Sequence, residues 1–461
     1  MKKKLTMFLF LALITVLVAC SNDDSKDSSK SDNDSKASGE QVTVTIASWG
    51  FGTGEDKNLN RLLVDAFNEA HDDIQVEIDE SIDPADWNGS LSAAASASSM
   101  PDVFMLAQVP TGLANDWLLD LTELTDADED FAKVPESVQE AVKHNGTVYA
   151  LPAGQHFLGY FVNKDLFEQA NLNAPEMGIS IEEFTAAIRD VTDVNNGVAG
   201  LNHPYSIPDW YPAAANNDLG WYTYQNGQFQ LDTDEFISGV NLANNMITNG
   251  YAYETLAEDQ KANFTGEDPE QVWLNGGVGI KWDGTWITGH LEAQSDFEWD
   301  FIGIPGDRVV MTQDYYGISS STKHPEAAYE VAKWMSFSPE GFLKQMEIAD
   351  ADEELALASM PVTTEQEVLD AYFERFDAPG LRAAYDNIDN AIIEPVKTVP
   401  GYQQSRWEAP TGIAVGDNPN VNIAGLIDAG MRGEIKIVDY VSQINELANQ
   451  KYKEGLDAIN Q

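Results

Sequence analysis

The strongest constraint on the fold is a regular alternation of strand-like and helix-like segments near the start of the chain. Apolar and polar residues alternate over 42–46 and again over 74–78, which is typical of half-buried strands. Between them, residues 59–70 repeat apolar side chains at intervals of three and four, which indicates a helix with one buried stripe. An alanine- and serine-rich helix is expected over about 84–99, followed by a third strand over 102–106. This order predicts an α/β fold with a parallel sheet, and it places ligands beyond the carboxyl ends of the strands.

The second half of the chain returns to the same pattern without an internal sequence repeat. Strands are expected over 301–304 and 316–319, and a helix is expected to begin near Pro325. Roughly 420 residues follow the polar start of the chain, which is enough for two hydrophobic cores. We therefore expect two lobes.

The N-terminus has the features of an export signal. Three lysines precede an apolar run over 5–19, which at about fifteen residues is too short to span a membrane. The run ends in Leu17-Val18-Ala19-Cys20, which resembles the lipobox of bacterial lipoproteins, and Cys20 is the only cysteine in the chain. We expect residues 1–19 to be a signal peptide, Cys20 to carry a lipid anchor, and the polar residues 21–40 to form a flexible tether. This places the protein on the outer face of the cell membrane.

The charge of the chain limits its partners. The formal net charge is −50 at pH 7. Such a negative field disfavours nucleic acid and anionic ligands and favours neutral or cationic solutes, although solubility in a salty or alkaline habitat would also explain the acidity.

Five separated segments match, in order, the pattern of one protein family. They are Val44-Thr45-Ile46-Ala47-Ser48-Trp49-Gly50, Met100-Pro101-Asp102-Val103, Gly146-Thr147-Val148-Tyr149-Ala150-Leu151-Pro152, Val162-Asn163-Lys164-Asp165-Leu166-Phe167 and the stretch from Asn275 to Trp286. With them, nearly the whole chain after residue 40 resembles bacterial extracellular solute-binding proteins of the sugar-binding group. The chain departs from the family's pattern around residues 175–184, at 278–280 and at 204–221. The last region has no fixed counterpart and is a candidate for setting ligand identity.

This resemblance implies a two-lobed clamp like that of periplasmic binding proteins. Each lobe would be a mostly parallel sheet flanked by helices, and strand crossovers would act as hinges near Leu151-Pro152 and residues 312–318. Lobe 1 would hold residues 41–152 and about 314–360, and lobe 2 residues 153–313 and about 361–461. The resemblance also implies a monomeric lipoprotein that delivers a sugar or oligosaccharide to the permease subunits of an ABC importer, with no cofactor and no catalysis.

The candidate ligand-binding residues are aromatic and hydrogen-bonding side chains near strand ends and loops. Tryptophan and tyrosine rings can cover the apolar face of a pyranose, and carboxylate, amide and guanidinium groups can bind its hydroxyls. For each residue, packing in a core or pairing on the surface is the competing interpretation. The aromatic candidates are Trp49, Trp210, Tyr211, Trp221, Trp282, Trp286 and Tyr316, and the polar candidates are Gln108, Gln155, Asp283 and Arg406.

Catalysis has no support in the sequence. The six histidines lack metal-ligand spacing, and there is no nucleophile elbow or phosphate-binding glycine loop. Three alternatives stay open: an anchored carbohydrate-active enzyme, a surface adhesion lipoprotein, and a binding protein for polyamines or peptides.

Overall fold

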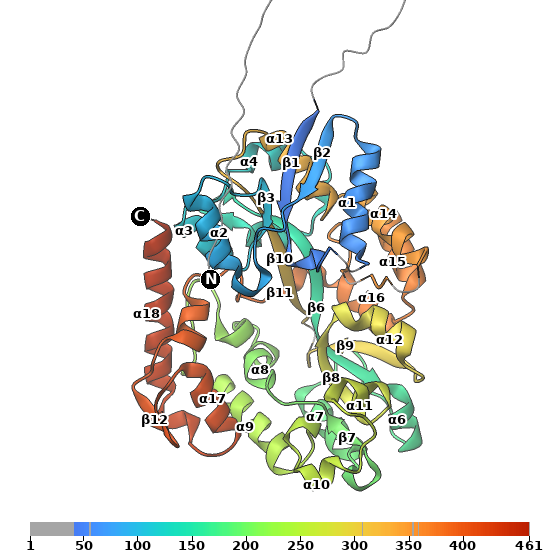
Figure 1. Cartoon of the computed structure of the whole chain (residues 1–461). Helices are drawn as coiled ribbons and strands as arrows, with labels where there is room; N and C mark the ends of the chain where they lie inside the picture. The colour runs from blue at the N-terminus through green and yellow to red at the C-terminus, as the bar shows by residue number, and fades with distance from the viewer. Residues whose placement is uncertain (1–40, 55–56, 307, 353–354, 358, 461) are drawn as a thin grey trace, which may run out of the picture. The chain divides into compact units, whose positions relative to one another are not determined.

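The computed structural model describes residues 41–460 except 55–56, 307, 353–354 and 358 (Figure 1). The predicted signal peptide, the lipidated Cys20 and the tether lie outside these residues. The strands are β1 (Val42–Ala47), β2 (Ile74–Ile78), β3 (Val103–Met105), β4 (Lys143–His144), β5 (Thr147–Val148), β6 (Leu151–Asn163), β7 (Ala199–Leu201), β8 (Val278–Gly284), β9 (Trp299–Gly303), β10 (Val310–Ile318), β11 (Ile392–Ile393), β12 (Ile413–Val415) and β13 (Asn418–Val421).

The helices surround the main sheet (Figure 1). They are α1 (Leu59–Ala70), α2 (Trp87–Ser96), α3 (Val109–Ala114), α4 (Thr122–Asp126), α5 (Glu136–Ala141), α6 (Lys164–Gln169), α7 (Ile181–Val191), α8 (Ile207–Ala215), α9 (Asp234–Thr248), α10 (Glu258–Lys261), α11 (Pro269–Leu274), α12 (Thr288–Gln294), α13 (Pro325–Trp334), α14 (Pro339–Asp350), α15 (Gln366–Arg375), α16 (Pro379–Asp386), α17 (Ile423–Met431) and α18 (Val441–Ile459). No helix among the described residues combines the length and the apolar character needed to cross a membrane.

The predicted β-α-β-α-β unit is present. Strand β1 pairs in parallel with β2 and with β3, and α1 and α2 connect them along the chain. Helix α1 begins after Asn58, whose side chain accepts hydrogen bonds from the backbone amides of Asn60 and Arg61. It buries Leu63 and Phe67 on the predicted stripe.

Within the described residues, nine strands form one mixed sheet in the order β2-β1-β3-β10-β6-β8-β7, with β9 beside β6 and β11 beside β10. Strands β6 and β10 are the long crossovers, and they run antiparallel to each other. Strand β10 is also antiparallel to β3, and β6 is antiparallel to β8 and β9. The predicted α/β architecture is present, and its sheet is mixed. Strands β6 and β10 run antiparallel to each other and to β3, β8 and β9, whereas β10 is parallel to β11.

The buried side chains form two hydrophobic clusters. The first contains Phe67, Phe104 and Trp334 and extends from the elements around β1–β3 to β8 and β9. The second contains Trp210 and Tyr402. Strand β6 contributes to both clusters, with Phe157 in the first and Tyr160 in the second. Buried residues of α15 and α16 belong to the first cluster. The division into two lobes with the stated boundaries stays a prediction.

Candidate functional site

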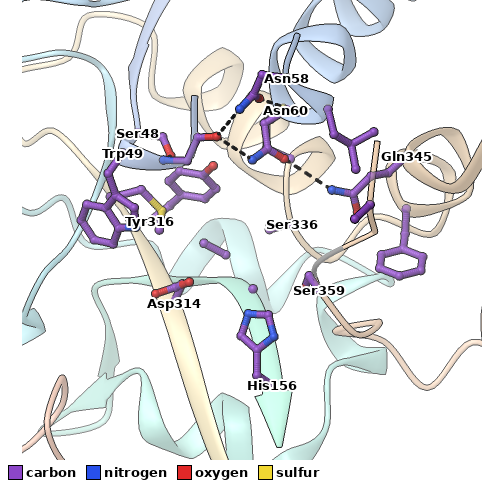
Figure 2. Close-up of a pocket in the computed structure, with 18 of the residues that line it drawn as sticks. Ser48, Trp49, Asn58, Asn60, His156, Asp314, Tyr316, Ser336, Gln345 and Ser359 are labelled. Atoms are coloured by element: carbon purple, nitrogen blue, oxygen red, sulfur yellow. Dashed lines mark hydrogen bonds between the residues drawn. The ribbon is translucent and has the colours of Figure 1, made fainter. Parts of the chain in front are cut away.

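A cavity of about 410 Å³ opens where β1 ends and α1 begins (Figure 2). The crossover strands β6 and β10 supply its floor, and residues from α13 to α14 and the loop after α14 complete its wall. This is the carboxyl end of β1, where the fold was expected to place a ligand. Its lining residues are Ser48, Trp49, Gly50, Lys57, Asn58, Leu59, Asn60, Met105, Ala153, Gly154, His156, Asp314, Tyr316, Met335, Ser336, Phe342, Gln345, Leu355, Ala356 and Ser359.

Hydrogen bonds fix the loop that carries Trp49. The side-chain amides of Asn58 and Asn60 both donate to the carbonyl oxygen of Gly50, at 3.0 and 3.1 Å (Figure 2). The hydroxyl of Ser48 accepts from the amide of Gly50 at 3.0 Å. This loop is therefore organised before any ligand binds, which lowers the entropic cost of binding.

The Trp49 ring is supported from behind. It packs edge-on against Trp87, with ring centroids 5.1 Å apart. The indole nitrogen of Trp87 in turn donates to the carbonyl oxygen of Met105 at 2.9 Å. Trp49 thus presents an ordered, partly buried aromatic surface to the cavity.

The floor of the cavity combines a carboxylate with an imidazole. Asp314 on β10 accepts a hydrogen bond from the Lys397 ammonium through Oδ1, at 2.5 Å, while its side chain lines the cavity. His156 on β6 also lines the cavity, and its Nδ1 atom is buried without a protein partner. Burial lowers the pKa of His156 to about 4, so the imidazole is neutral at pH 7. A neutral imidazole can both donate and accept a hydrogen bond, as a sugar hydroxyl requires.

Trp286 stands beside His156. The two rings meet edge-on with centroids 5.3 Å apart, and the Trp286 side chain is 41% exposed. A Cβ atom at Gly284 would lie 2.3 Å from the Trp286 ring, so this close approach requires glycine. The hydroxyl of Thr285 accepts from the backbone amide of Phe157 at 3.1 Å. The segment Gly284-Thr285-Trp286 therefore holds the Trp286 indole against His156 on the floor of the cavity.

The described residues with large, exposed apolar side chains are few. They are Tyr205, Trp286, Trp407 and Val438. Tyr205 stacks on His203 with ring centroids 5.2 Å apart. Among the described residues, three aromatic rings are therefore exposed, and most of the other aromatic side chains are buried.

Three of the predicted ligand-binding residues gather here: Trp49 and Tyr316 line the cavity, and Trp286 touches its floor through His156. The other aromatic candidates pack in the second hydrophobic cluster. Trp210 is fully buried and donates to the Tyr160 hydroxyl. Trp221 stacks on Trp282, and Tyr211 packs against the same cluster.

The polar candidates have protein partners outside the cavity. The Gln108 amide donates to the Gln403 side chain. Gln155 is fully buried and donates to the carbonyl oxygen of Pro361.

Asp283 and Arg406 are also held by the protein. Asp283 accepts from the Gly284 amide through Oδ1 and pairs with Lys281 through Oδ2. Arg406 is paired with Asp209. The direct roles of these four polar residues in binding stay predictions.

The cavity is also lined by five residues that were not predicted from the sequence: His156, Asp314, Asn58, Asn60 and Gln345. Gln155 was chosen because it lies just past Leu151-Pro152, but successive side chains of a strand point to opposite faces. The neighbouring residue, His156, therefore takes the cavity side. Asn58 could have been recognised as a helix N-cap, because it directly precedes the apolar stripe of α1.

We expect the stability of the protein to fall on acidification between pH 6.5 and 4. Burial lowers the pKa of His156 and of His203 to about 4, whereas an unfolded histidine titrates near pH 6.5. The contribution of the two neutral histidines to the free energy of unfolding is complete above pH 6.5. It is lost as the pH falls towards 4, because the unfolded chain then binds protons that the folded state excludes. Each histidine should lower the free energy of unfolding by up to about 1.4 kcal/mol per pH unit in this window.

Urea denaturation at a series of pH values measures this loss. The His156→Gln variant should lose roughly half of the histidine-dependent slope, while His290→Gln, at an exposed position, should keep it. An unchanged slope in His156→Gln would contradict the assignment of a neutral, buried imidazole.

Among the described residues, no group of three or more histidine, cysteine or acidic side chains is arranged to hold a metal ion.

The comparisons with known proteins place the chain in a family. Residues 52–340 match the family model of the bacterial extracellular solute-binding protein. An uncharacterised extracellular binding protein of an ABC transporter from Pyrococcus horikoshii is 24% identical over 208 residues; the match covers 43% of this chain and spans about half, 47%, of that relative.

Two solved structures share the fold. An ABC substrate-binding protein from Listeria monocytogenes in complex with cycloalternan has a TM-score of 0.64 at 19% identity, covering 89% of this chain and 98% of that one. The sugar-binding protein MalE from Xanthomonas citri has a TM-score of 0.66 at 15% identity, covering 91% and 100%. The family match extends over more than half of the chain, and the chain therefore belongs to the bacterial extracellular solute-binding proteins.

Proposed function

We propose that the protein captures a sugar or oligosaccharide in the cavity between Trp49, His156 and Trp286 and delivers it to an ABC importer. The observation that carries this proposal is the chemistry of the cavity wall. Trp49 and Tyr316 line the cavity, its floor presents a neutral imidazole and a carboxylate, and Trp286 packs edge-on against that imidazole. A sugar ring presents C–H faces to such aromatic surface and hydroxyls to such polar groups.

The charges at the cavity favour a neutral ligand over an anionic one. Asp314 is paired with Lys397 at 2.5 Å, which leaves no excess positive charge on that part of the floor. The formal net charge of −50 acts against anionic ligands over a longer range. The structural relatives support the sugar class, because one is in complex with cycloalternan and another is described as a sugar-binding protein.

Capture would proceed by closure of a clamp. Strands β6 and β10 are the long crossovers of the sheet, so a small change in their backbone angles would move the elements around β1–β3 relative to those around β7 and β8. Only a ligand that contacts the closed form better than the open form can shift this equilibrium. The closed complex would then dock on permease subunits, and the diacylglyceryl group proposed on Cys20 would keep the protein at the outer face of the membrane.

The test is a thermal-shift measurement on protein that begins at Ser21. The panel contains glucose, maltose, maltotriose, cellobiose, cellotriose, spermidine and short peptides. We expect at least one oligosaccharide to raise the melting temperature saturably, because a ligand at one hundred times its dissociation constant stabilises the folded state by about 2.7 kcal/mol.

The outcomes separate the alternatives. A higher melting temperature with spermidine or a peptide alone would contradict the sugar assignment, but it would remain consistent with capture by a clamp. No rise with any compound would contradict small-molecule capture and favour an adhesion role. If the protein instead cleaves an oligosaccharide and releases products, the result would favour the alternative of an anchored carbohydrate-active enzyme.

A further inference from the structure

Two segments that are far apart in the sequence are joined by a pair of hydrogen bonds. Gln108, the residue before α3, donates from its side-chain amide to Oε1 of Gln403 at 3.0 Å. The next residue, Val109, donates its backbone amide to the carbonyl oxygen of Lys397 at 2.9 Å. We call these two hydrogen bonds the clasp.

One side of the clasp belongs to the elements around β1–β3. Gln108 comes shortly after β3, and Val109 packs in the first hydrophobic cluster. The Thr111 hydroxyl of α3 donates to Oε1 of Gln108 at 3.2 Å. The Gln108 side chain is therefore held by its own helix while its amide group reaches Gln403.

The other side of the clasp belongs to the elements around β7 and β8. Tyr402 packs in the second hydrophobic cluster, which also contains Leu201 of β7 and Ile280 of β8. Gly401 has a φ angle of 69°, and a Cβ atom there would collide with a backbone carbonyl oxygen of α18. Gln403 thus belongs to a segment that is fixed to α18 and to the second cluster.

Helices α3 and α18 lie side by side without a continuous packed contact (Figure 1). A cavity of about 330 Å³ lies between them. Pro110 and Ala114 line this cavity from α3, and Gly455 and Ala458 line it from α18. Protein interiors are usually close-packed, so such a gap leaves little packing energy to keep the two helices together. The clasp supplies directional contacts where the packing is weak.

The two hydrogen bonds of the clasp differ in their distance along the chain from the crossover strands. The ammonium group of Lys397 pairs with Asp314 of β10 on the cavity floor at 2.5 Å, and its carbonyl oxygen accepts from Val109. The bond between Gln108 and Gln403 lies further along the segment. A rotation about the crossover strands would therefore break the bond between Gln108 and Gln403 before the bond beside β10.

We propose that the hydrogen bond between Gln108 and Gln403 forms without sugar and favours the closed clamp, so that both residues strengthen sugar binding without touching the sugar. Neither residue lines the cavity beside Trp49. The inference rests on the clamp of the proposed function. It gives Gln108 a different role from the direct ligand contact predicted from the sequence.

The size of the effect follows from the nature of the bond. A neutral hydrogen bond of this kind changes an equilibrium by about two- to tenfold. When the binding-competent form is the minor form, the affinity for a ligand changes by the same factor as the population of that form. Losing either glutamine should therefore weaken sugar binding by about two- to tenfold.

The first test measures distances in the sugar-free protein by double electron–electron resonance. Protein that begins at Ser21 lacks Cys20, the only cysteine of the chain, so spin labels attach only at introduced cysteines. Ala97→Cys after α2 and Asn241→Cys on α9, both at exposed positions, report on the two groups of elements.

Without sugar, Gln108→Ala and Gln403→Ala should each shift the distance distribution in the same direction, opposite to the shift that saturating sugar causes. The double variant should shift it no further than either single variant, because both changes remove the same bond. Both side chains are only half-buried, so the variants should fold normally. Gln366→Ala, which removes an amide hydrogen bond to Asp370 within α15, should leave the distribution unchanged.

The second test is calorimetric titration with the sugar that gives the largest thermal shift among maltose, maltotriose, cellobiose and cellotriose. Gln108→Ala, Gln403→Ala and the double variant should all bind it about two- to tenfold more weakly than the unchanged protein. The control Gln366→Ala should bind it normally.

An unchanged sugar-free distribution in both single variants would overturn the clasp. Weaker binding in Gln108→Ala with normal binding in Gln403→Ala would also overturn it and favour a direct contact of Gln108 with the sugar. If no compound of the panel binds, the proposed function fails and the effect on affinity fails with it. The sugar-free distances then still decide whether the bond between Gln108 and Gln403 holds the two groups of elements together.

Discussion

Replacing Trp286 with alanine is expected to weaken sugar binding by about 30-fold or more, because hot-spot tryptophans at binding sites typically contribute about 2 kcal/mol or more. Its ring is 41% exposed and meets His156 at the floor of the cavity. Trp286 belongs to neither hydrophobic cluster, so the unliganded protein should nearly keep its melting temperature. Isothermal titration calorimetry with the sugar that gives the largest thermal shift measures the change.

Two variants serve as controls. Trp286→Phe keeps a smaller aromatic face and should lose only part of the affinity. Val438→Ala removes another exposed apolar side chain, far along the chain from the cavity residues, and should bind normally. Unchanged affinity in Trp286→Ala would show that the exposed indole does not contact the sugar.

Replacing Gln155 with leucine is expected to destabilise the protein by about 1 to 3 kcal/mol, the cost of one buried polar group left without a partner. Gln155 is fully buried on β6, and its carbonyl oxygen accepts from the Gln313 amide on β10 at 2.9 Å. Its own amide donates to Pro361 at 3.2 Å. Leucine would leave the buried Gln313 amide without this acceptor, whereas the Pro361 carbonyl would keep the hydrogen bond that it accepts from the Tyr385 hydroxyl. Chemical denaturation measures the loss of stability.

The matched control is the double variant Gln155→Leu/Gln313→Leu. Removing both amides together deletes one pair of mutually dependent groups, so the double variant should be more stable than Gln155→Leu alone. It should also bind sugar with nearly normal affinity, because neither amide lines the cavity. Loss of sugar binding in the stably folded double variant would instead support the direct ligand role predicted for Gln155 from the sequence.

The fold was predictable because its early elements have strong and separate periodicities. The strands over 42–46 and 74–78 alternate with period two, and α1 carries an apolar stripe with a helical period. The mixed direction of the sheet was not predictable in the same way. The hydrophobic pattern indicates that β6 and β10 are buried. It does not indicate the direction of the neighbouring strands, because a strand buried on both faces gives a nearly continuous apolar run in either case.

The candidate site was harder to predict because it depends on which face a side chain takes. Gln155 and His156 are adjacent in the sequence, yet one is sealed between strands and the other lines the cavity. Trp210 and Trp286 both stand in plausible loop regions, yet one is fully buried and the other is 41% exposed. Asp314 was missed because its neighbours Tyr315 and Tyr316 offered a more visible aromatic signal. Tertiary packing decides which of these side chains are buried and which are exposed. Local patterns in a single sequence do not reveal that packing.

Hydrogen–deuterium exchange with and without the binding sugar tests the central claim most directly, since it locates the ligand along the whole chain. We predict slower exchange in peptides that cover residues 48–54, 57–60, 153–159 and 284–288. These residues belong to the segment between β1 and the start of α1, the floor of the cavity and the segment of Trp286. A groove of about 700 Å³ beside α6 and β9 provides the internal comparison, and its residues 164–177 and 298–300 should exchange as before. Protection confined to that groove, with none at the cavity, would contradict the account.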